Sequence, residues 1–338
     1  MSIAGHATTE GTARFATRFP EAAAQAFYRK ASSLSVSSLG IGSYLGEPNS
    51  ATDGGYEDAI GAALEGGINF IDTSLNYREQ RSERAIGRAL AAGPRRDEYV
   101  VGTKAGYLIR GAVPALARED VVGGIHSMAP AFLLDQLARS LENLRLEAID
   151  ILYLHNPETQ LDYVDEDEFY SRVRTAFECL ESAVSAGSIR GYGAATWNGF
   201  RDSTLSLTRM VSMAHSVGGD GHHFRWIQLP FNLAMTEAIS RPAEDGQTML
   251  ELADSFGLNV VASASLLQAR LAADLPAIMD SKIGGLRTSA QRAIQYARSA
   301  PGIKVALAGM SQVAHVAENL GIAGVHPLTR DAFATVLR

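Results

Sequence analysis

The chain has 338 residues and a mass of 36.0 kDa, with 46% hydrophobic and 20% charged residues, a composition typical of a folded globular protein. Its 30 basic and 37 acidic residues give a net charge of −7, which argues against nucleic-acid binding because such sites usually carry a basic surface. A single cysteine, Cys179, excludes a disulfide framework and a cysteine-based structural zinc site. No apolar run is long enough for a membrane span, so we expect neither a nucleic-acid partner nor a membrane partner.

Residues 1–30 precede the first apolar run and form an N-terminal extension. Its segment from Arg14 to Lys30 carries arginines and few acids, which is compatible with an organelle-targeting peptide or with a short helix. A secretory signal would need an apolar core that these residues lack. We expect a short helical extension that caps the domain formed by residues 31–338, and a cytoplasmic protein.

Short apolar runs, most of them rich in β-branched residues, recur eight times along the rest of the chain and predict buried strands of a parallel sheet. They are Val36–Ile41, Ile68–Asp72, Tyr99–Lys104, Ile149–His155, Ile189–Ala194, Trp226–Leu229, Leu258–Ser263 and Ile303–Ala308.

The segments between these runs predict helices. Phe169, Val173, Phe177, Leu180 and Val184 share one helical face, and a glycine three residues later is a typical helix stop. A second helix is predicted to begin at Pro130, since proline is favoured in the first turn of a helix.

A strand followed by a helix, eight times over, is the order of a single (β/α)8 barrel, the TIM-barrel class of α/β proteins. A doubly wound sheet is the alternative, but its usual strand count is lower. Three connections are long, namely Gly106–Ala129, Asn156–Asp167 and Leu271–Thr288. Long loops in a compact domain are usually functional or disordered.

Polar residues end several of the predicted strands. Asp72, Lys104 and His155 stand at the ends of the second, third and fourth strands, and Gln228 lies near the end of the sixth. Because the carboxyl ends of all barrel strands meet at one mouth, we expect these side chains to converge there. Tyr77 follows Asp72 by five residues and can fold over the same mouth.

These side chains suit proton transfer to a carbonyl oxygen. A free tyrosine has a pKa of about 10, and a nearby ammonium lowers it. Lys104 would supply that charge, Asp72 would hold Lys104 in place, and Tyr77 would donate the proton. His155 would donate a hydrogen bond to the same oxygen. Taken singly, each residue could instead form a structural ion pair, a helix cap or a core hydrogen bond.

The same segments closely resemble the signatures of the aldo-keto reductases. The matching stretches are Gly67-Ile68-Asn69-Phe70-Ile71-Asp72-Thr73-Ser74 with Tyr77, Ser82-Glu83 and Ile86-Gly87; Gly102-Thr103-Lys104; Ile149 through Pro157; Ile189 through Gly193; Gln228 with Asn232; and Gly309 through Asn319. The resemblance spans about Leu34 to Leu320. It implies a barrel that reduces aldehydes or ketones with NADPH, with Asp72, Tyr77, Lys104 and His155 as the catalytic residues.

The resemblance also implies a cofactor site. Gln228 would bind the nicotinamide amide, with Thr196 or Asn198 as the neighbouring contact. The backbone of Ser265 and Leu267 would meet the pyrophosphate. The positions that would meet the adenosine half are Gly309, Ser311, Glu318 and Asn319.

Several positions depart from the family pattern. Gln80 and Ala264 replace a usual glycine and a usual nicotinamide-stacking aromatic residue, and Trp197 could stack instead. The arginine that often pairs with the 2′-phosphate is absent near Ser311 and His315. Because an arginine–phosphate contact is strong and directional, its absence keeps NADH as the alternative to NADPH. Other cations could replace that arginine, namely Lys282, Arg287 and Arg292.

Three other motifs do not indicate a further functional site. The glycines of Gly40–Gly46 have one residue too many for a dinucleotide-binding fingerprint, so we interpret this segment as the first loop at the mouth. His126, His222 and His223 lack carboxylates at ligand spacing, and no metal site is predicted. The acidic run Asp162–Glu168 is expected to lead into a helix N-terminus, where negative charge is favourable.

We therefore expect a reductase of small carbonyl compounds. The residues expected to contact the substrate are Tyr44, Tyr107, His126, Asn156 and Trp197. Two alternatives remain: a lyase or aldolase in which Lys104 forms a Schiff base, and a cofactor-binding regulatory subunit. The sequence does not determine the substrate or the oligomeric state.

Overall fold

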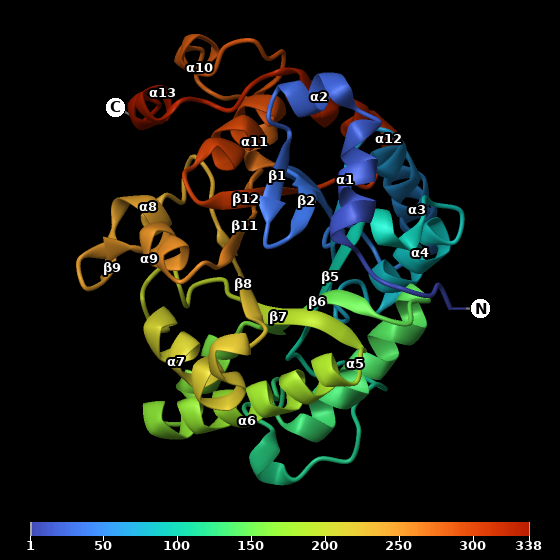
Figure 1. Cartoon of the computed structure of the whole chain (residues 1–338), viewed down its shortest axis with the longest axis vertical. Helices are drawn as coiled ribbons and strands as arrows, with labels where there is room; N and C mark the ends of the chain where they lie inside the picture. Colours follow the sequence, from blue (N-terminus) through green and yellow to red (C-terminus); the bar gives the residue numbers. More distant parts are fainter. Residues whose placement is uncertain (1, 338) are drawn as a thin grey trace.

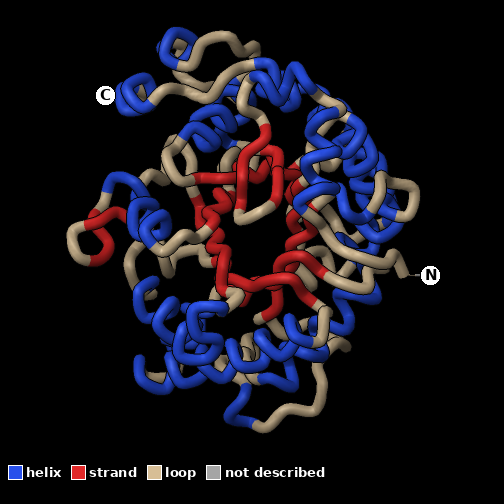
Figure 2. The backbone as a smooth tube through the Cα atoms, in the orientation of Figure 1, coloured by secondary structure: helices blue, strands red, loops and turns tan. Residues whose placement is uncertain are grey.

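The computed structural model describes residues 2–337 and contains a closed barrel of eight parallel strands (Figures 1 and 2). Each strand pairs with the next one along the chain, and the last pairs with the first. The strands are β3 (Leu39–Gly42), β4 (Phe70–Asp72), β5 (Val100–Ala105), β6 (Ile149–His155), β7 (Ile189–Ala195), β8 (Phe224–Pro230), β11 (Asn259–Ser263) and β12 (Ile303–Gly309). The predicted (β/α)8 barrel is confirmed.

Helices surround the barrel (Figure 2). The longer ones are α3 (Ser50–Glu65), α4 (Arg81–Leu90), α5 (Pro130–Leu144), α6 (Glu166–Ser185), α7 (Leu207–Gly218), α9 (Met249–Ser255), α11 (Ser289–Ser299) and α12 (Val313–Asn319). Shorter elements are α8 (Glu237–Ser240), α10 (Ile278–Lys282), α13 (Arg330–Thr335) and the hairpin of β9 (Pro242–Glu244) and β10 (Gln247–Thr248).

The sequence signals for helix ends are confirmed. Pro130 occupies the first turn of α5. Gly187, with a φ of +78°, follows the end of α6 in the left-handed conformation that a glycine adopts without strain. The acidic run leads into α6, whose first turn is capped by the Asp165 side chain accepting from the Glu168 N–H. None of the helices within residues 2–337 combines the length and the apolar character that crossing a bilayer requires.

The first predicted strand, Val36–Ile41, is in fact two strands. Leu34–Ser37 forms β2, which pairs antiparallel with β1 (Tyr28–Ala31), and the barrel strand β3 begins only at Leu39. Ser38 separates them: its N–H donates to the Phe27 carbonyl of the hairpin, while its own carbonyl accepts from the barrel at Ala306. Ser37 and Ser38 interrupt the apolar run at this change of partner, but the run alone does not show which strand each half pairs with.

The β1–β2 hairpin lies across the amino-terminal opening of the barrel (Figure 1). Val36 is fully buried and packs with the barrel interior, including Val100, Trp226 and Val305. The preceding helices α1 (Thr9–Thr17) and α2 (Pro20–Ala24) pack beside it, with Phe15 of α1 buried. The closing hairpin runs to Ser37, so the predicted boundary at residue 30 cuts through it.

Candidate active site

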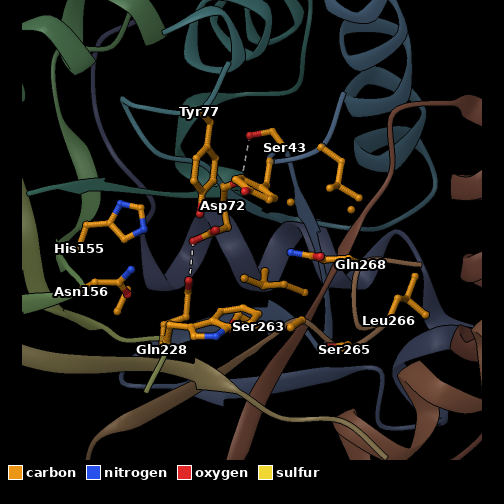
Figure 3. Close-up of a pocket in the computed structure, with 18 of the residues that line it drawn as sticks. Ser43, Asp72, Tyr77, His155, Asn156, Gln228, Ser263, Ser265, Leu266 and Gln268 are labelled. Atoms are coloured by element: carbon orange, nitrogen blue, oxygen red, sulfur yellow. Dashed lines mark hydrogen bonds between the residues drawn. The ribbon is translucent and has the colours of Figure 1, made fainter. Parts of the chain in front are cut away.

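A cavity of about 470 Å³ opens at the carboxyl ends of the strands (Figure 3). The predicted site residues that line it are Tyr44, Asp72, Tyr77, Tyr107, His155, Asn156, Thr196, Trp197, Gln228, Ser265 and Gly309. They come from loops and strand ends that are far apart in the sequence. The expected convergence at one barrel mouth is therefore observed.

Asp72 and Lys104 form an ion pair at the floor of this cavity. The Lys104 Nζ lies 2.6 Å from Asp72 Oδ1 and 2.7 Å from the Thr73 carbonyl oxygen. Burial lowers the pKa of Lys104, but the Asp72 carboxylate, together with the neighbouring Tyr77 hydroxyl, outweighs burial and leaves that pKa above its ordinary value. Lys104 is therefore charged at neutral pH.

Tyr77 lies directly above this ion pair. The centre of its ring is 5.0 Å from Lys104 Nζ and 5.0 Å from the centre of the Tyr44 ring. Burial raises the pKa of Tyr77, and the charge of Lys104 offsets only part of that rise. The sequence led us to expect a lowered pKa, because burial cannot be read from residue types alone. The phenol is thus fully protonated at neutral pH.

His155 faces the cavity beside Tyr77, with 5.9 Å between the two ring centres. Burial, together with the nearby Lys104 charge, holds the pKa of His155 well below its ordinary value. The imidazole is therefore neutral at pH 7. Its Nδ1 lies 3.1 Å from the Ser74 Oγ.

Gln228 connects the ion pair to the rest of the cavity. Its Nε2 donates to Asp72 Oδ2 over 2.8 Å (Figure 3). The two oxygens of Asp72 are thereby divided between Lys104 and Gln228. The side-chain Oε1 of Gln228 has no hydrogen-bond partner among residues 2–337 and is available to a ligand amide.

Aromatic and amide side chains form the outer wall near His155. Asn156 donates from Nδ2 to the Tyr107 hydroxyl over 2.9 Å, and the Tyr107 ring packs edge-on to His155. Trp197 is 40% exposed at the rim, and Tyr44 is 56% exposed. Tyr44, Tyr107, Asn156 and Trp197 are four of the residues that the sequence analysis expects to contact the substrate.

Glu158 supports this wall and was missed by sequence reasoning. Its Oε1 accepts from the backbone N–H groups of Trp197, Asn198 and Gly199 at 2.9, 3.1 and 3.2 Å. Burial raises the pKa of Glu158, and the three backbone donors counter that rise. The carboxylate follows the His155-Asn156-Pro157 segment closely, which was the only available signal.

The structure contradicts the expectation that His126 contacts the substrate. This side chain is fully buried behind Tyr107 and does not line the cavity. Its Nε2 lies 2.8 Å from the His155 carbonyl oxygen, and its Nδ1 lies 2.9 Å from Gln160 Nε2. His126 therefore braces the strand end that carries His155.

The loop after β11 borders the opposite side of the cavity (Figure 3). Four of its residues have positive φ angles, which non-glycine residues rarely adopt: Ala264, Leu267, Gln268 and Ala269. The Leu267 N–H already donates to the Ala264 carbonyl over 2.7 Å, and Leu267 does not line the cavity. The expected backbone contact of Leu267 is therefore not supported, whereas Ser265, Leu266 and Gln268 do line the cavity.

Other expected cofactor positions lie outside the cavity. Asn198 is exposed, and its Oδ1 accepts from Arg201, which leaves Thr196 as the cavity-lining residue of the two. The positions expected near the adenosine half that do not line the cavity are Ser311, Glu318 and Asn319. Asn319 is 3% exposed, and its Oδ1 has no hydrogen-bond partner among the described residues.

The alternative phosphate-binding cations are partly occupied. Arg292 contacts Asp280 at 3.1 Å and the Leu286 carbonyl at 2.9 Å. Lys282 donates to the carbonyl oxygens near the end of α13. Arg287 is exposed. None of the three lines the cavity.

Within residues 2–337, the structure contains no group of three or more histidine, cysteine or acidic side chains arranged to hold a metal ion. His223 instead pairs through Nδ1 with Glu181 Oε2 at 2.7 Å, and His222 contacts Arg225.

A tyrosine, a lysine–aspartate pair and a neutral histidine thus lie together at the mouth of a (β/α)8 barrel. A family model described as "Aldo/keto reductase family" matches residues 38–274. The chain therefore belongs to the aldo/keto reductase family.

Individual relatives are distant. A D-threo-aldose 1-dehydrogenase from Pseudomonas sp is 33% identical over 146 residues, which cover 39% of this chain and 41% of that protein. An NADH-specific methylglyoxal reductase from Escherichia coli (strain K12) is 27% identical over 167 residues, which cover 48% of this chain and 49% of that protein. The chain thus spans about half or less of these relatives. An uncharacterized oxidoreductase from Bacillus subtilis (strain 168), YqkF, is 23% identical over 89% of this chain and 91% of its own length.

Solved structures share the fold. An aldo/keto reductase from Klebsiella pneumoniae in complex with NADP and acetate matches with a TM-score of 0.66 at 20% identity, covering 90% of this chain and 92% of that one. A glycerol dehydrogenase from Gluconobacter oxydans matches with a TM-score of 0.67 at 20% identity, and the match covers 92% of this chain and 94% of that one.

Proposed function

We propose that this protein reduces an aldehyde or ketone to an alcohol, using a reduced nicotinamide nucleotide and a proton from Tyr77. The observation that carries the proposal is the position of a protonated Tyr77 over the buried Lys104–Asp72 pair, facing a cavity. A bound nicotinamide would supply the hydride for the carbonyl carbon.

The protein's own groups would handle the oxygen. Tyr77 would donate its proton as negative charge develops on the substrate oxygen. The Lys104 ammonium would stabilise the phenolate that remains, and Asp72 would keep Lys104 in place and charged. This arrangement needs no further proton carrier between Tyr77 and the substrate.

The residues around the cavity fit a nicotinamide nucleotide. The side-chain Oε1 of Gln228 can accept from a carboxamide N–H, and Thr196 lies in the same cavity. The unpaired Oδ1 of Asn319 is an acceptor that the amino group of an adenine could satisfy. For the part of the nucleotide between the nicotinamide and the adenine, the loop after β11 contributes Ser265 and Gln268, which line the cavity.

NADPH is the donor that family membership favours, and NADH is the alternative. No arginine occupies the expected 2′-phosphate position, and Arg292 is already paired with Asp280. The exposed Arg287 is the cation best able to compensate. One relative, from Escherichia coli, is named as NADH-specific, which keeps both nucleotides in the proposal.

The Schiff-base alternative is disfavoured by the surroundings of Lys104. A lysine nucleophile must lose its proton, but Lys104 donates to two oxygens and its pKa is raised. A purely regulatory role finds no specific support in the site. We further propose a small carbonyl compound as the only required partner and the cytoplasm as the location.

A titration tests the cofactor proposal. NADPH and NADH are added separately while tryptophan fluorescence is recorded. Trp197 lines the cavity, whereas Trp226 is 4% exposed in the barrel interior, so quenching should come from Trp197. Saturable quenching that disappears in Trp197→Phe is expected. If neither nucleotide binds to the wild type by this signal or by calorimetry, the proposal is wrong.

A further inference from the structure

The segment that follows β7 forms a turn, residues 196–200, at the rim of the cavity. Thr196 and Trp197 line the cavity, but Trp197 and Asn198 are exposed, so the packing of these two side chains does not hold the turn. The base of the turn is fixed by the Thr196 N–H, which donates to the Gln228 backbone carbonyl over 2.9 Å. The position of its apex therefore depends on hydrogen bonds made by the backbone.

One carboxylate holds the apex of this turn. Glu158 lies in the connection between β6 and α6. Its Oε1 accepts from three successive backbone N–H groups, those of Trp197, Asn198 and Gly199. Hydrogen bonds to a charged acceptor are roughly twice as strong as neutral ones, so this contact depends on the negative charge. Both oxygens of a carboxylate are acceptors, and the contact is therefore the same whichever way the side chain is turned.

The turn is shaped for this close approach. A Cβ atom on Gly199 would come within 2.7 Å of Leu205 Cδ1 and within 3.3 Å of the Glu158 carboxyl carbon, so a larger residue would push the turn away from the carboxylate. The second carboxylate oxygen, Oε2, is buried and has no hydrogen-bond partner among residues 2–337. A buried oxygen without a partner is unfavourable for folding, which indicates that Glu158 serves more than stability.

We propose that Glu158 is a positioning residue whose charged carboxylate keeps Thr196 and Trp197 on the cavity wall, where the nicotinamide end of the nucleotide binds. The inference rests on the reductase function proposed above. Glu158 does not itself line the cavity, so it acts through the backbone of the turn. The apex of the turn cannot move outward without breaking three hydrogen bonds at once.

Glu158→Gln removes the charge and keeps the size of the side chain. An amide has one acceptor oxygen, and its N–H groups cannot bond the N–H groups of the turn. If the amide oxygen faces the turn, its hydrogen bonds are neutral and weaker; if the amide nitrogen faces the turn, donors oppose donors. In either orientation the turn should loosen.

A second carboxylate that accepts from backbone N–H groups provides the matched control. Glu244 of β9 accepts from the N–H groups of Leu207 and Thr208 at the start of α7, and from the Ser206 hydroxyl. None of these four residues lines the cavity. Glu244→Gln therefore removes the same kind of contact from a part of the molecule that does not border the proposed nucleotide site.

Fluorine NMR observes the turn without any nucleotide. The chain has two tryptophans, so protein labelled with 5-fluorotryptophan gives two signals, and Trp197→Phe assigns them. Trp226, which is 4% exposed in the barrel interior, is the internal reference for a folded barrel. In Glu158→Gln the Trp197 signal should shift or broaden while the Trp226 signal stays in place, and in Glu244→Gln neither signal should change.

A Trp197 signal that is the same in Glu158→Gln and in the wild type would overturn the proposal. If Glu158→Gln does not fold, Glu158→Asp takes its place. This variant keeps the charge but shortens the side chain by one methylene, so the turn must either follow the carboxylate or lose its hydrogen bonds. A shifted Trp197 signal beside an unchanged Trp226 signal then supports the proposal, and two unchanged signals contradict it.

Nucleotide binding provides the second readout. Calorimetry gives the Kd for NADPH and for NADH, and steady-state kinetics gives the KM of the nucleotide and kcat. In Glu158→Gln the Kd and the KM should rise about tenfold, the effect of one hydrogen bond to a charged group, and kcat at saturating nucleotide should fall less than that. Glu244→Gln should keep the wild-type Kd and KM. An unchanged Kd in Glu158→Gln overturns the inference while the reductase function stands. A wild type that binds neither nucleotide contradicts the reductase function, and the Trp197 signal then decides alone whether Glu158 holds the turn.

Discussion

In the proposed reaction Tyr77 serves as the acid, and its surroundings keep it protonated until the substrate oxygen becomes charged. Burial raises its pKa, and Lys104 lies 5.0 Å from the ring centre, close enough to stabilise the phenolate formed during turnover. The resting group is thus a phenol, and the cation acts mainly on the product of proton transfer.

Replacing Tyr77 with phenylalanine removes the proton donor and little else. We expect carbonyl reduction to fall by about 10²- to 10⁴-fold, the usual contribution of a positioned acid, while the Kd of the nucleotide changes little. Steady-state rates and fluorescence titration measure the two effects. A Tyr77→Phe variant with most of the wild-type rate would show that the acid has been misassigned.

His126 should make stability depend on acid pH. Burial lowers the pKa of His126 to about 4, below its ordinary value of 6.5. As pH falls below 6.5, the unfolded chain binds the proton first, so stability present above 6.5 is lost on the way down to about 4. This residue alone should lower the free energy of unfolding by about 2 kcal/mol between about pH 7.5 and pH 5.

Urea unfolding of the wild type and His126→Gln at those two pH values measures this effect. His126→Gln should have a lower free energy of unfolding than the wild type at both pH values. Its free energy of unfolding should fall less than that of the wild type between pH 7.5 and pH 5. The fall that it still shows would come from other groups, such as His155, whose pKa is also lowered. Equal losses in both proteins would show that His126 is not held neutral.

The sequence predicted the positions of residues at strand ends better than the positions of residues in loops. Asp72, Lys104 and His155 could be placed because a strand end in a barrel has one location. His126 and Leu267 could not, because the path of a long loop depends on packing that residue types do not reveal. The sequence also did not reveal the hydrogen-bond partners of the two histidines, namely Ser74 for His155 and Gln160 for His126.

Two neighbouring loops, β3–α3 and β4–α4, are joined by a buried cation. Arg78 donates to the Glu47 and Asn49 carbonyls and pairs with the Asp53 carboxylate, which also binds Arg81 at 2.6 Å. Arg78 has a φ of +50°, an uncommon conformation for a residue with a side chain. These contacts hold the loop of Tyr44 against the loop of Tyr77.

Removing Asp53 should therefore loosen this part of the mouth. Asp53→Ala leaves Arg78 buried without its carboxylate, and we expect a loss of about 3 kcal/mol in the free energy of unfolding. Glu57→Ala, which removes a more exposed partner of Arg88, should cost less than about 1 kcal/mol and is the matched control. Equal losses measured by urea unfolding would show that the buried pair has no special role.

Helices were predicted more accurately than the first strand. Helix boundaries are marked by local residue types, such as Pro130 at the start of α5 and Gly187 after the end of α6. The division of Val36–Ile41 into β2 and β3 depends on pairing with residues 28–31 and with β12, which is long-range information.

In the whole molecule, the two ends of the barrel differ: one end is closed by packing, and the other end carries the candidate site. The amino-terminal end of the barrel is closed by the hairpin, whose Val36 packs in the barrel interior, and the carboxyl-terminal end opens into the cavity that carries the candidate site. Such a division is typical of (β/α)8 barrels, in which catalysis belongs to the carboxyl-terminal face.

A substitution in the hairpin should affect stability alone. Val36 is fully buried in the closed end, so Val36→Ala should lower the free energy of unfolding by about 1–2 kcal/mol through lost burial and a small cavity. The kcat of the folded variant at 25 °C should match that of the wild type. A large fall in kcat without unfolding would mean that the two ends are coupled.

The most direct test of the central claim is a single-turnover experiment. Protein saturated with NADPH, or with NADH, is mixed with glyceraldehyde, and the loss of the reduced nicotinamide is compared with the alcohol formed. We predict one alcohol per nucleotide oxidised in the wild type, and a bound but nearly unreactive nucleotide in Tyr77→Phe. Bound nucleotide that no carbonyl compound oxidises, or equal rates in the two proteins, would contradict carbonyl reduction with Tyr77 as the acid.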